Sequence, residues 1–449
     1  MVTSKGRTSR GVLSVAAVAG LVAVVALWAS GRGLAALGGG LGLALTSTGR
    51  LAGLVAAYLL LVQVLLMARV PVIEKVFGQD VLVRVHRTVG FWSFNLMWGH
   101  VLIVTVGYAL TAHANVLSEG WLLIATYAGM ALAAAGTIAL TVVAVSSVRR
   151  ARRRLRYESW HLLHLYAYLG VGLAIPHELW TGQDFQGRMV VQVFWWVAYG
   201  IAAGAVLVFR VGVPVWRTVR HGITVTSVTR ESPGVVSVRM GGRGLHRLPV
   251  RTGQYFVFRF LDGPGWSRGN PFSLSSPART DSLRITAKDL GDGSGRLAGL
   301  TPGTRVLIEG PYGRLTSDRQ VGSRVAMLAC GIGITPLRAL LDDLPYEPGD
   351  AVLLYRARTP EDLVFRDELD ALAVRRGVRV VYLTGSRDRA GMGWLPAGTP
   401  AGALEDWLPR LADWDVFVCG PDAWMDEAAA SVLAAGLPSN QLHQERFSW

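Results

Sequence analysis

The first half of the chain alternates long apolar stretches with short polar connections. A run of about 20 apolar residues has the length of a helix that crosses a bilayer core about 30 Å thick. The glycine-rich residues 31–46 are expected to form a loop or a re-entrant segment. The pattern predicts an all-α bundle of six membrane spans, over residues 11–29, 47–68, 85–108, 121–146, 157–179 and 188–209.

From Ile223 the pattern changes to short runs rich in β-branched and aromatic residues, separated by Gly, Pro and Asp. Such runs are typical of a small antiparallel β-barrel. The expected barrel strands are 223–228, 235–240, 255–260 and 283–287. Strands then alternate with helices, which predicts an α/β domain with strands at 325–329, 352–355, 378–383 and 416–418. We therefore expect a multi-domain protein with a helical membrane domain (1–217), a β-barrel (218–318) and an α/β domain (319–449).

The distribution of charge along the chain accounts for its basic composition, so nucleic-acid binding is not needed to explain it. The formal net charge is +14, yet arginines gather at the ends of apolar segments, with six of them within Arg149–Arg156. Arg and Lys concentrate in cytoplasmic connections of membrane proteins. Both termini and the even-numbered connections carry them, which predicts a multi-pass cell-membrane protein with both termini and the soluble half in the cytoplasm. Lys5, Arg7 and Arg10 would also suit a cleaved signal peptide, but the later spans favour an uncleaved first span.

Two cysteines, Cys330 and Cys419, are the chain's only ones. They are far apart in sequence and form no Cys-x-x-Cys motif. This excludes a disulfide framework, a cysteine zinc site and an iron–sulfur ligand set.

Histidines inside the apolar stretches are the strongest functional signal. His86 and His100 lie fourteen residues apart, which places them on one helix face with a rise of about 21 Å between them. His164 and His177 lie in the fifth span, near matching depths. Ionisable residues within a membrane are functional candidates. One such pair could be a hydrogen bond between helices, but four histidines at two depths favour two metal sites with two imidazoles each.

The fifth span leaves one ligand undecided. His164 and His177 are thirteen residues apart, about 140° out of register on an ideal helix. Pro176 removes a backbone donor and kinks helices, so we expect it to re-aim the face. His161 remains an alternative to His164, because neither spacing to His177 is better.

The paired histidines resemble those of the ferric-reductase transmembrane domain of NADPH oxidases and ferric reductases. The segment Trp160-His-Leu-Leu-His164-Leu-Tyr is similar to the fifth span of that family. The resemblance implies two b-type haems, the inner held by His86 and His164 and the outer by His100 and His177. Arg50 resembles an arginine that lies beside the outer haem in the oxidases.

A segment of the expected barrel resembles the flavin motif of ferredoxin-reductase-type barrels. In that motif an Arg or His precedes an aromatic and a hydroxyl residue; the aromatic packs on the flavin ring and the hydroxyl bonds to it. Here Asn270 takes the basic position, so Arg268 is the candidate for the flavin phosphate. The turn Gly291-Asp-Gly293-Ser294 resembles the family's pyrophosphate turn. The implied FAD-binding residues are Arg268, Asn270, Pro271, Phe272, Ser273, Gly291, Gly293 and Ser294.

The α/β domain offers two turns for a nicotinamide nucleotide. Glycines in Cys330-Gly331-Ile-Gly333-Ile-Thr335-Pro336 permit close approach of a phosphate, which a helix N-terminus attracts. Cys419-Gly420-Pro421 resembles the nicotinamide end of the family's site, where the cysteine helps to place the ring. Ser386 and Arg387 follow the third strand, where NADPH-preferring relatives hold the 2′-phosphate. Phe447 resembles the terminal aromatic over the flavin, so Phe447, Cys419 and Ser273 are the expected residues of hydride transfer.

The combination predicts a membrane flavohaem oxidoreductase. Electrons would pass from NAD(P)H, with a preference for NADPH, through FAD and two haems to an acceptor outside. Oxygen near Arg50 is favoured over ferric iron, for which His113, Glu119 and Glu178 are the outer candidates. Two alternatives remain, an electron-feeding subunit for an unidentified protein acceptor and a nucleotide-sensing transporter with a histidine proton path.

Overall fold

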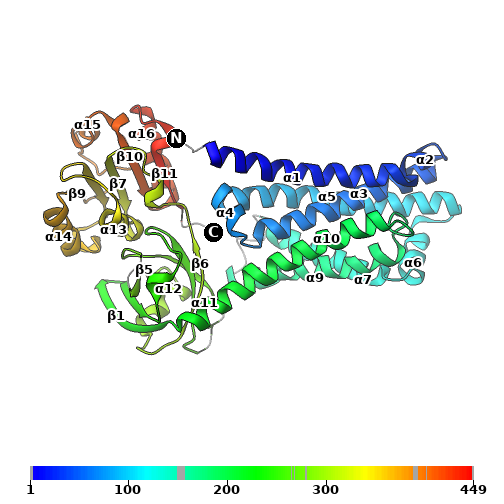
Figure 1. Ribbon diagram of the computed structural model, residues 1–449, viewed down its shortest axis with the longest axis horizontal. Coiled ribbons are helices and arrows are strands. Elements are labelled where there is room, and N and C mark those ends of the chain that lie inside the picture. The colour runs from blue at the N-terminus through cyan, green and yellow to red at the C-terminus, as the bar shows by residue number, and fades with distance from the viewer. Residues whose placement is uncertain are drawn as a thin grey trace. The chain divides into compact units, whose positions relative to one another are not determined.

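The computed structural model describes residues 4–148, 157–263, 265–266, 268–278, 281–387, 393–400 and 402–446. The chain divides into two compact units, with the boundary between residues 211 and 212. The first unit is helical, and the second carries three β-sheets (Figure 1). The arginine cluster Arg149–Arg156 and Phe447 lie outside the described residues.

Apolar helices build the first unit. Within the described residues, five helical stretches have the length and composition to cross a membrane: Ser9–Leu37, Leu41–Met67, Val81–Ala112, Met130–Ser147 and Met189–His221. The helix Tyr157–Thr181 is as long as these but carries three histidines and Glu178, and it is not among them. The helices are α1 (Ser4–Trp28), α2 (Leu34–Leu37), α3 (Leu41–Met67), α4 (Pro71–Phe77), α5 (Gln79–Ala112), α6 (Val116–Thr126), α7 (Met130–Ser147), α9 (Tyr157–Thr181) and α10 (Met189–Ala205).

Two expected segment boundaries are wrong. The glycine-rich stretch 31–46 is mostly helical. The chain kinks at Gly31, where the backbone leaves helical geometry, then forms α2, and α3 begins at Leu41. The expected span 121–146 is two helices, since Gly129 adopts a φ of 82° between α6 and α7. A side chain at Gly129 would also lie 2.8 Å from the backbone nitrogen of His177, so only glycine fits this corner.

Glycines allow the helices to pack closely in pairs. A Cβ atom at Gly107 of α5 would lie 2.7 Å from the backbone nitrogen of Thr46 in α3. A Cβ atom at Gly136 of α7 would lie 2.7 Å from the carbonyl oxygen of Gly170 in α9. Small residues are what permit such backbone approach between membrane helices. α3 with α5, and α7 with α9, are therefore the tightly packed pairs.

The strands expected to form a barrel make two antiparallel sheets, and this part of the chain is called the barrel. One has the order β1-β2-β5 and the other β4-β3-β6, and single bridges at Thr224–Arg305 and Leu274–Ile285 join them. Phe256, Phe258 and Ile285 lie in the core that the sheets enclose. The strands are β1 (Thr224–Ser232), β2 (Val235–Gly241), β3 (Tyr255–Phe260), β4 (Asn270–Ser273), β5 (Ser282–Lys288) and β6 (Val306–Tyr312).

A parallel sheet with the order β11-β10-β7-β8-β9 completes the second unit. Its central strands are mostly apolar, because helices cover both faces of parallel sheets; Asp415 in β10 and Arg356 at the end of β8 are the buried charged exceptions. The carboxyl ends of β7 and β10 are neighbours, with Ala329 opposite Cys419, and ligands of such sheets bind at this edge. The strands are β7 (Arg324–Cys330), β8 (Ala351–Arg356), β9 (Arg379–Leu383), β10 (Trp414–Cys419) and β11 (Leu442–Gln444); the helices of this unit are α11 (Val213–His221), α12 (Asp292–Gly295), α13 (Ile334–Asp343), α14 (Arg366–Arg376), α15 (Ala403–Trp407) and α16 (Asp422–Ala434).

Candidate functional site

The four candidate haem ligands meet as two pairs between α5 and α9. The ring centres of His86 and His164 lie 6.1 Å apart, and those of His100 and His177 lie 6.4 Å apart. A bound metal lies about 2 Å from an imidazole nitrogen, which is about 1 Å from its ring centre, so two imidazoles on one metal separate their ring centres by about 6 Å. Each pair therefore has room for one metal between its rings.

Hydrogen bonds orient three of these rings. Nδ1 of His100 lies 2.9 Å from the carbonyl oxygen of Gly49, and Nδ1 of His177 lies 2.6 Å from that of Ala174. Nδ1 of His164 lies 3.3 Å from the hydroxyl of Ser147. Ligating histidines commonly use one nitrogen in this way and bind the metal with the other. The three rings thus keep Nε2 for a ligand.

α9 continues as one helix through Pro176, and both of its paired histidines still reach α5. The ring opposite His86 belongs to His164 rather than to His161. Trp160 packs beside His164 with ring centres 5.0 Å apart. The structure thus brings together the four residues expected from the sequence, and α9 passes through Pro176 without ending.

An apolar cluster lies between the two histidine levels. On α5, Phe94 and Met97 lie between His86 and His100 in the chain; on α9, Ala167 and Val171 occupy the matching interval, and these four pack in one cluster. Such packing excludes water between the levels. Burial of this kind is one of the features that tune a redox centre.

The donor set at each level fits a haem better than a free metal ion. Among the described residues, no group of three or more His, Cys, Asp and Glu side chains comes together as a metal site. A metal held by two imidazoles needs its remaining ligands from elsewhere. A haem macrocycle supplies four of them.

Arg50 lies beside the outer pair but is not a free cation. Gly49 and Gly53, which flank it on α3, both contact His100. The Arg50 Nε atom lies 3.5 Å from Asp184 Oδ2, and its guanidinium donates to Gln183. Its charge is therefore largely balanced by Asp184.

The three residues considered for ferric iron do not form a common metal site. Glu178 lies within α9, where Tyr199 donates to its carboxylate, and Glu119 is buried in α6. His113 follows the last residue of α5. Glu178 lies three residues before the end of α9 at Thr181.

The flavin motif forms β4 and faces the glycine turn. Ser273 is buried, and its hydroxyl has no hydrogen-bond partner among the described residues. Buried hydroxyls are nearly always bonded, so this one suits a ligand atom. A Cβ atom at Gly293 would lie 2.4 Å from the side-chain oxygen of Asn270, so the motif and the turn are in contact.

Other residues of the flavin motif and turn have local contacts. Phe272 packs toward Phe258, with ring centres 6.4 Å apart, and Pro271 pairs with Val257. The Ser294 hydroxyl accepts from the backbone nitrogen of Leu290 at 2.8 Å, so it stabilises the turn that follows Gly291. Arg268 precedes β4 by two residues, and its backbone nitrogen donates to Gly265.

The two nucleotide turns interlock at the carboxyl edge of the parallel sheet. A Cβ atom at Gly333 would lie 2.2 Å from the carbonyl oxygen of Cys419, and one at Gly420 would lie 2.8 Å from Cβ of Cys330. Gly331 has a φ of 55°, which glycine adopts without strain. The expected residues Gly331, Gly333, Thr335, Pro336, Cys419, Gly420 and Pro421 are therefore brought to one place.

Cys419 lies where three segments converge. Its thiol is fully buried and donates to the carbonyl oxygen of Glu445 at 3.7 Å. A Cβ atom at Gly313, at the end of the barrel, would meet the Glu445 carboxylate, two residues before Phe447 in the chain. Burial, and then the charge of Glu445, raise the pKa of the Cys419 thiol well above its usual value, so the thiol stays neutral and acts by packing.

The chain matches known families in both halves. Residues 52–175 match the family described as "Ferric reductase like transmembrane component", and residues 327–430 match "Oxidoreductase NAD-binding domain". Ferredoxin–NADP reductase B of Sorangium cellulosum is 33% identical over 183 residues, covering 37% of this chain and 71% of that protein. The chain belongs to the ferric-reductase-like membrane oxidoreductases with a ferredoxin-reductase-type soluble half.

Another relative and a solved structure match the soluble half of this oxidoreductase. The ferredoxin reductase component of 3-ketosteroid-9-alpha-monooxygenase from Mycolicibacterium smegmatis is 30% identical over 206 residues, or 45% of this chain. The chain spans 56% of the length of that relative. The crystal structure of the Amycolatopsis cytochrome P450 reductase GcoB is 23% identical, with a TM-score of 0.44, covering 51% of this chain and 69% of that one. The family matches thus support FAD and NAD(P)H binding in the soluble half and indicate a membrane-embedded helical half.

Around the expected 2′-phosphate position, this oxidoreductase holds its arginines by internal contacts. The Arg387 guanidinium lies 2.7 Å from Glu427 and donates to the carbonyl oxygen of Gly393 at 3.0 Å. Arg356, which the sequence did not single out, is buried at the end of β8 and donates to the carbonyl oxygen of Gly385, next to Ser386, at 2.7 Å. The sequence signal that could have identified Arg356 is its position as the last residue of a strand that is otherwise mostly apolar.

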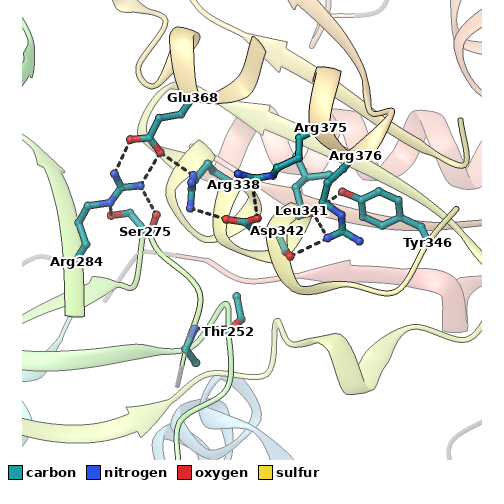
Figure 2. A network of polar contacts seen from close by, with 11 residues as sticks. Thr252, Ser275, Arg284, Arg338, Leu341, Asp342, Tyr346, Glu368, Arg375 and Arg376 are labelled. Carbon is teal, nitrogen blue, oxygen red and sulfur yellow. Dashed lines mark hydrogen bonds and ion pairs between the residues drawn. The ribbon is translucent and has the colours of Figure 1, made fainter. Parts of the chain in front are cut away.

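A second network that the sequence did not predict links the barrel to the α/β part (Figure 2). Arg284 of β5 makes two bonds to Glu368 of α14, at 2.6 and 2.9 Å, and donates to the carbonyl oxygen of Ser275 at 2.6 Å. Arg338 of α13 lies 2.8 Å from the same carboxylate. Because Ser275 follows Ser273 by two residues, this network also holds the end of the flavin motif.

Proposed function

We propose that this protein moves electrons from cytoplasmic NAD(P)H, through FAD and two bis-histidine haems, to an acceptor on the other side of the membrane. The observation that carries the proposal is the spacing of the two histidine pairs, 6.1 and 6.4 Å between ring centres. Each spacing is that of two imidazoles on one metal. Two facing histidine pairs on the same two helices match two haem sites, and a protein without haem would gain nothing from both.

In the soluble half, the chain's residues hold and align the two cofactors. FAD, when bound, would supply the conversion of a hydride into single electrons. Ser273 would donate its hydroxyl to the flavin, and Phe272 would pack on the ring. Gly331 and Gly333 would let the nucleotide phosphates approach the start of α13, Cys419 would help to place the nicotinamide ring, and Phe447 would cover the flavin.

In the membrane half, the histidines fix two redox levels. A haem with two imidazole ligands transfers electrons at its edge and has no open iron position. His86 and His164 would hold the inner haem, and His100 and His177 the outer. The arginine-rich connections support this orientation, because they are typical of the cytoplasmic side.

Oxygen is the first candidate for the acceptor. Because the iron positions are filled, oxygen must take its electron at the outer haem edge, and one NAD(P)H would reduce two oxygen molecules to two superoxide anions, releasing NAD(P)⁺ and a proton. Ferric iron is the second candidate. The separation of Glu178, Glu119 and His113 favours oxygen, because no built iron site is formed by them.

A partner protein is the alternative acceptor. The Mycolicibacterium relative is named as the ferredoxin reductase component of a monooxygenase. Such a role here would make the membrane half a relay to a membrane or periplasmic enzyme.

An absorption spectrum of the purified protein tests the proposal against a nucleotide-sensing transporter. Reduction by NADPH under argon should give the sharp bands of low-spin haem. A well-expressed but colourless protein would reject haem, and a haem spectrum that NADPH cannot reduce would reject the relay. Superoxide-dismutase-sensitive dye reduction in air, beside ferric-chelate reduction under argon, then separates the acceptors.

A further inference from the structure

A basic hollow lies on the surface where α11 packs against the barrel. Its volume is about 490 Å³. We call it the basic hollow; its lining residues are Trp216, Val219, Arg220, His221, Arg243, Gly244 and Arg247. All of them belong to the second compact unit, so the hollow is complete within one part of the chain.

The basic hollow carries positive charge without compensating carboxylates. Arg220, Arg243 and Arg247 line it, and none of its lining residues is acidic. In the part of the chain that the structure describes, none of these arginines forms an ion pair with Asp or Glu. Arg243 donates to the carbonyl oxygen of Val219 at 3.0 Å, which ties the loop after β2 to α11 and fixes the arginine over the hollow.

Large apolar side chains surround the same arginines. Val215, Trp216 and Val219 of α11 are 57%, 58% and 69% exposed. The Arg220 guanidinium lies 5.5 Å from the centre of the Trp216 ring. Exposed apolar residues beside arginines on one short helix are the composition of a segment that lies in a membrane interface, where tryptophan is also enriched.

Helix length places α11 at that interface. The helical stretch Met189–His221 has 33 residues. About 20 residues suffice to cross the hydrocarbon core, so about a dozen remain, enough to pass through the lipid headgroup layer. The basic hollow begins at Trp216, within this extension.

We propose that the basic hollow binds the phosphate headgroup of an anionic membrane lipid, held by Arg220, Arg243 and Arg247, with Trp216 and Val219 against the acyl chains. The occupant must carry negative charge, because three arginines without carboxylates favour an anion. It must also carry an apolar part, because the exposed valines and tryptophan adjoin the charges. A phospholipid such as phosphatidylglycerol has both, whereas free phosphate has only the first. Bound lipid would fix the barrel end of α11 to the membrane surface.

The experiment is native mass spectrometry of the full-length protein, delipidated in detergent and titrated with phosphatidylglycerol or phosphatidylcholine. Phosphatidylglycerol should bind in preference. The triple variant R220Q/R243Q/R247Q should weaken that binding about ten-fold or more. The matched control is R230Q/R305Q/R358Q, which removes three exposed arginines outside the hollow and should bind as the unmodified protein does.

Four results would overturn the proposal. These are equal binding of the two lipids, unchanged binding by the hollow variant, equal loss in the control, and displacement of the lipid by millimolar inorganic phosphate. A second variant, Trp216→Ser, guards against misfolding of the triple variant. It should weaken lipid binding while FAD content is unchanged, and unchanged lipid binding would also contradict the proposal. None of these measurements depends on haem or on the terminal acceptor.

Discussion

At the scale of single residues, functional side chains with a regular spacing in the sequence were predictable. Ion pairs between residues far apart in the sequence were not. The spacing of His86 and His100 within one apolar stretch made them candidates from sequence alone. In the structure their rings face those of His164 and His177 in α9. By contrast, Arg284 and Glu368 are 84 residues apart, and neither is unusual in its local sequence. Their partnership arises only when two parts of the soluble half fold against each other.

Ser273 offers a clean test of the flavin site. Because its hydroxyl has no hydrogen-bond partner among the residues that the structure describes, Ser273→Ala should leave thermal stability nearly unchanged while weakening FAD binding about ten-fold, the loss of one hydrogen bond. The neighbouring Ser275 is the control, since its hydroxyl is bonded to Thr286 at 2.8 Å. Ser275→Ala should lower the melting temperature. Flavin fluorescence titration and thermal unfolding measure both; a stability loss in Ser273→Ala with unchanged FAD affinity would contradict the assignment.

The pairing of Arg387 with Glu427 makes the nucleotide preference testable. Arg387→Ala should raise the KM for NADPH several-fold more than that for NADH, because a guanidinium fork matches a phosphate. Glu427→Gln should do the opposite, since it releases the arginine from its internal carboxylate. Steady-state kinetics with both nucleotides decides. Equal changes for NADPH and NADH in both variants would remove Arg387 from the site.

At the scale of elements, the sequence predicted helices and strands well but missed corners that close packing determines. The four expected barrel strands coincide with β1, β2, β3 and β5. The split between α6 and α7 was missed because apolar residues continue through it. What breaks the helix is the contact of Gly129 with the backbone of α9, which no local pattern reveals.

Glycine contacts predict which helix substitutions disturb the outer histidine pair. A Cβ atom at Gly53 of α3 would lie 2.6 Å from Nδ1 of His100, whereas one at Gly99, next to His100 in the chain, would contact nothing within 4 Å. Gly53→Ala should therefore displace the ring and lower haem content by about half. Gly99→Ala should retain full haem content by the pyridine haemochrome assay. Similar haem contents in the two variants would argue against His100 as a ligand.

The Arg284–Glu368–Arg338 network predicts a pH-dependent stability (Figure 2). Burial raises the pKa of Glu368, but the hydrogen bonds and charges of Arg284 and Arg338 outweigh burial and lower it below its usual 4.5. A lowered folded pKa contributes stability above pH 4.5, which is lost as the pH falls through the folded value. Glu368→Gln should thus be destabilising at neutral pH, with a difference from the unmodified protein that shrinks below pH 4.5.

Thermal unfolding of the full-length protein in detergent, followed by flavin release, measures that difference. Glu347→Gln, an exposed carboxylate in the same unit, is the control and should change little at any pH. A Glu368→Gln deficit that stays constant from pH 7 to pH 4 would assign the effect to packing rather than to the charge.

At the scale of the whole molecule, a membrane half and a soluble half were predictable from hydropathy and strand pattern. The family matches support both, because they fall on residues 52–175 and 327–430. The number of spans was not settled by pattern, since α9 carries the polar groups that its chemistry requires. The polar side chains of α9 lower its hydropathy, so hydropathy alone does not identify this helix as a membrane span.

The central claim is that one chain holds two bis-histidine haems, and cofactor stoichiometry tests it most directly. The pyridine haemochrome assay, set against released FAD, should give two haems per flavin in the unmodified protein. His100→Ala and His164→Ala should each give one haem per flavin, and His161→Ala should still give two. One haem or none in the unmodified protein, or a loss confined to His161→Ala, would contradict the account.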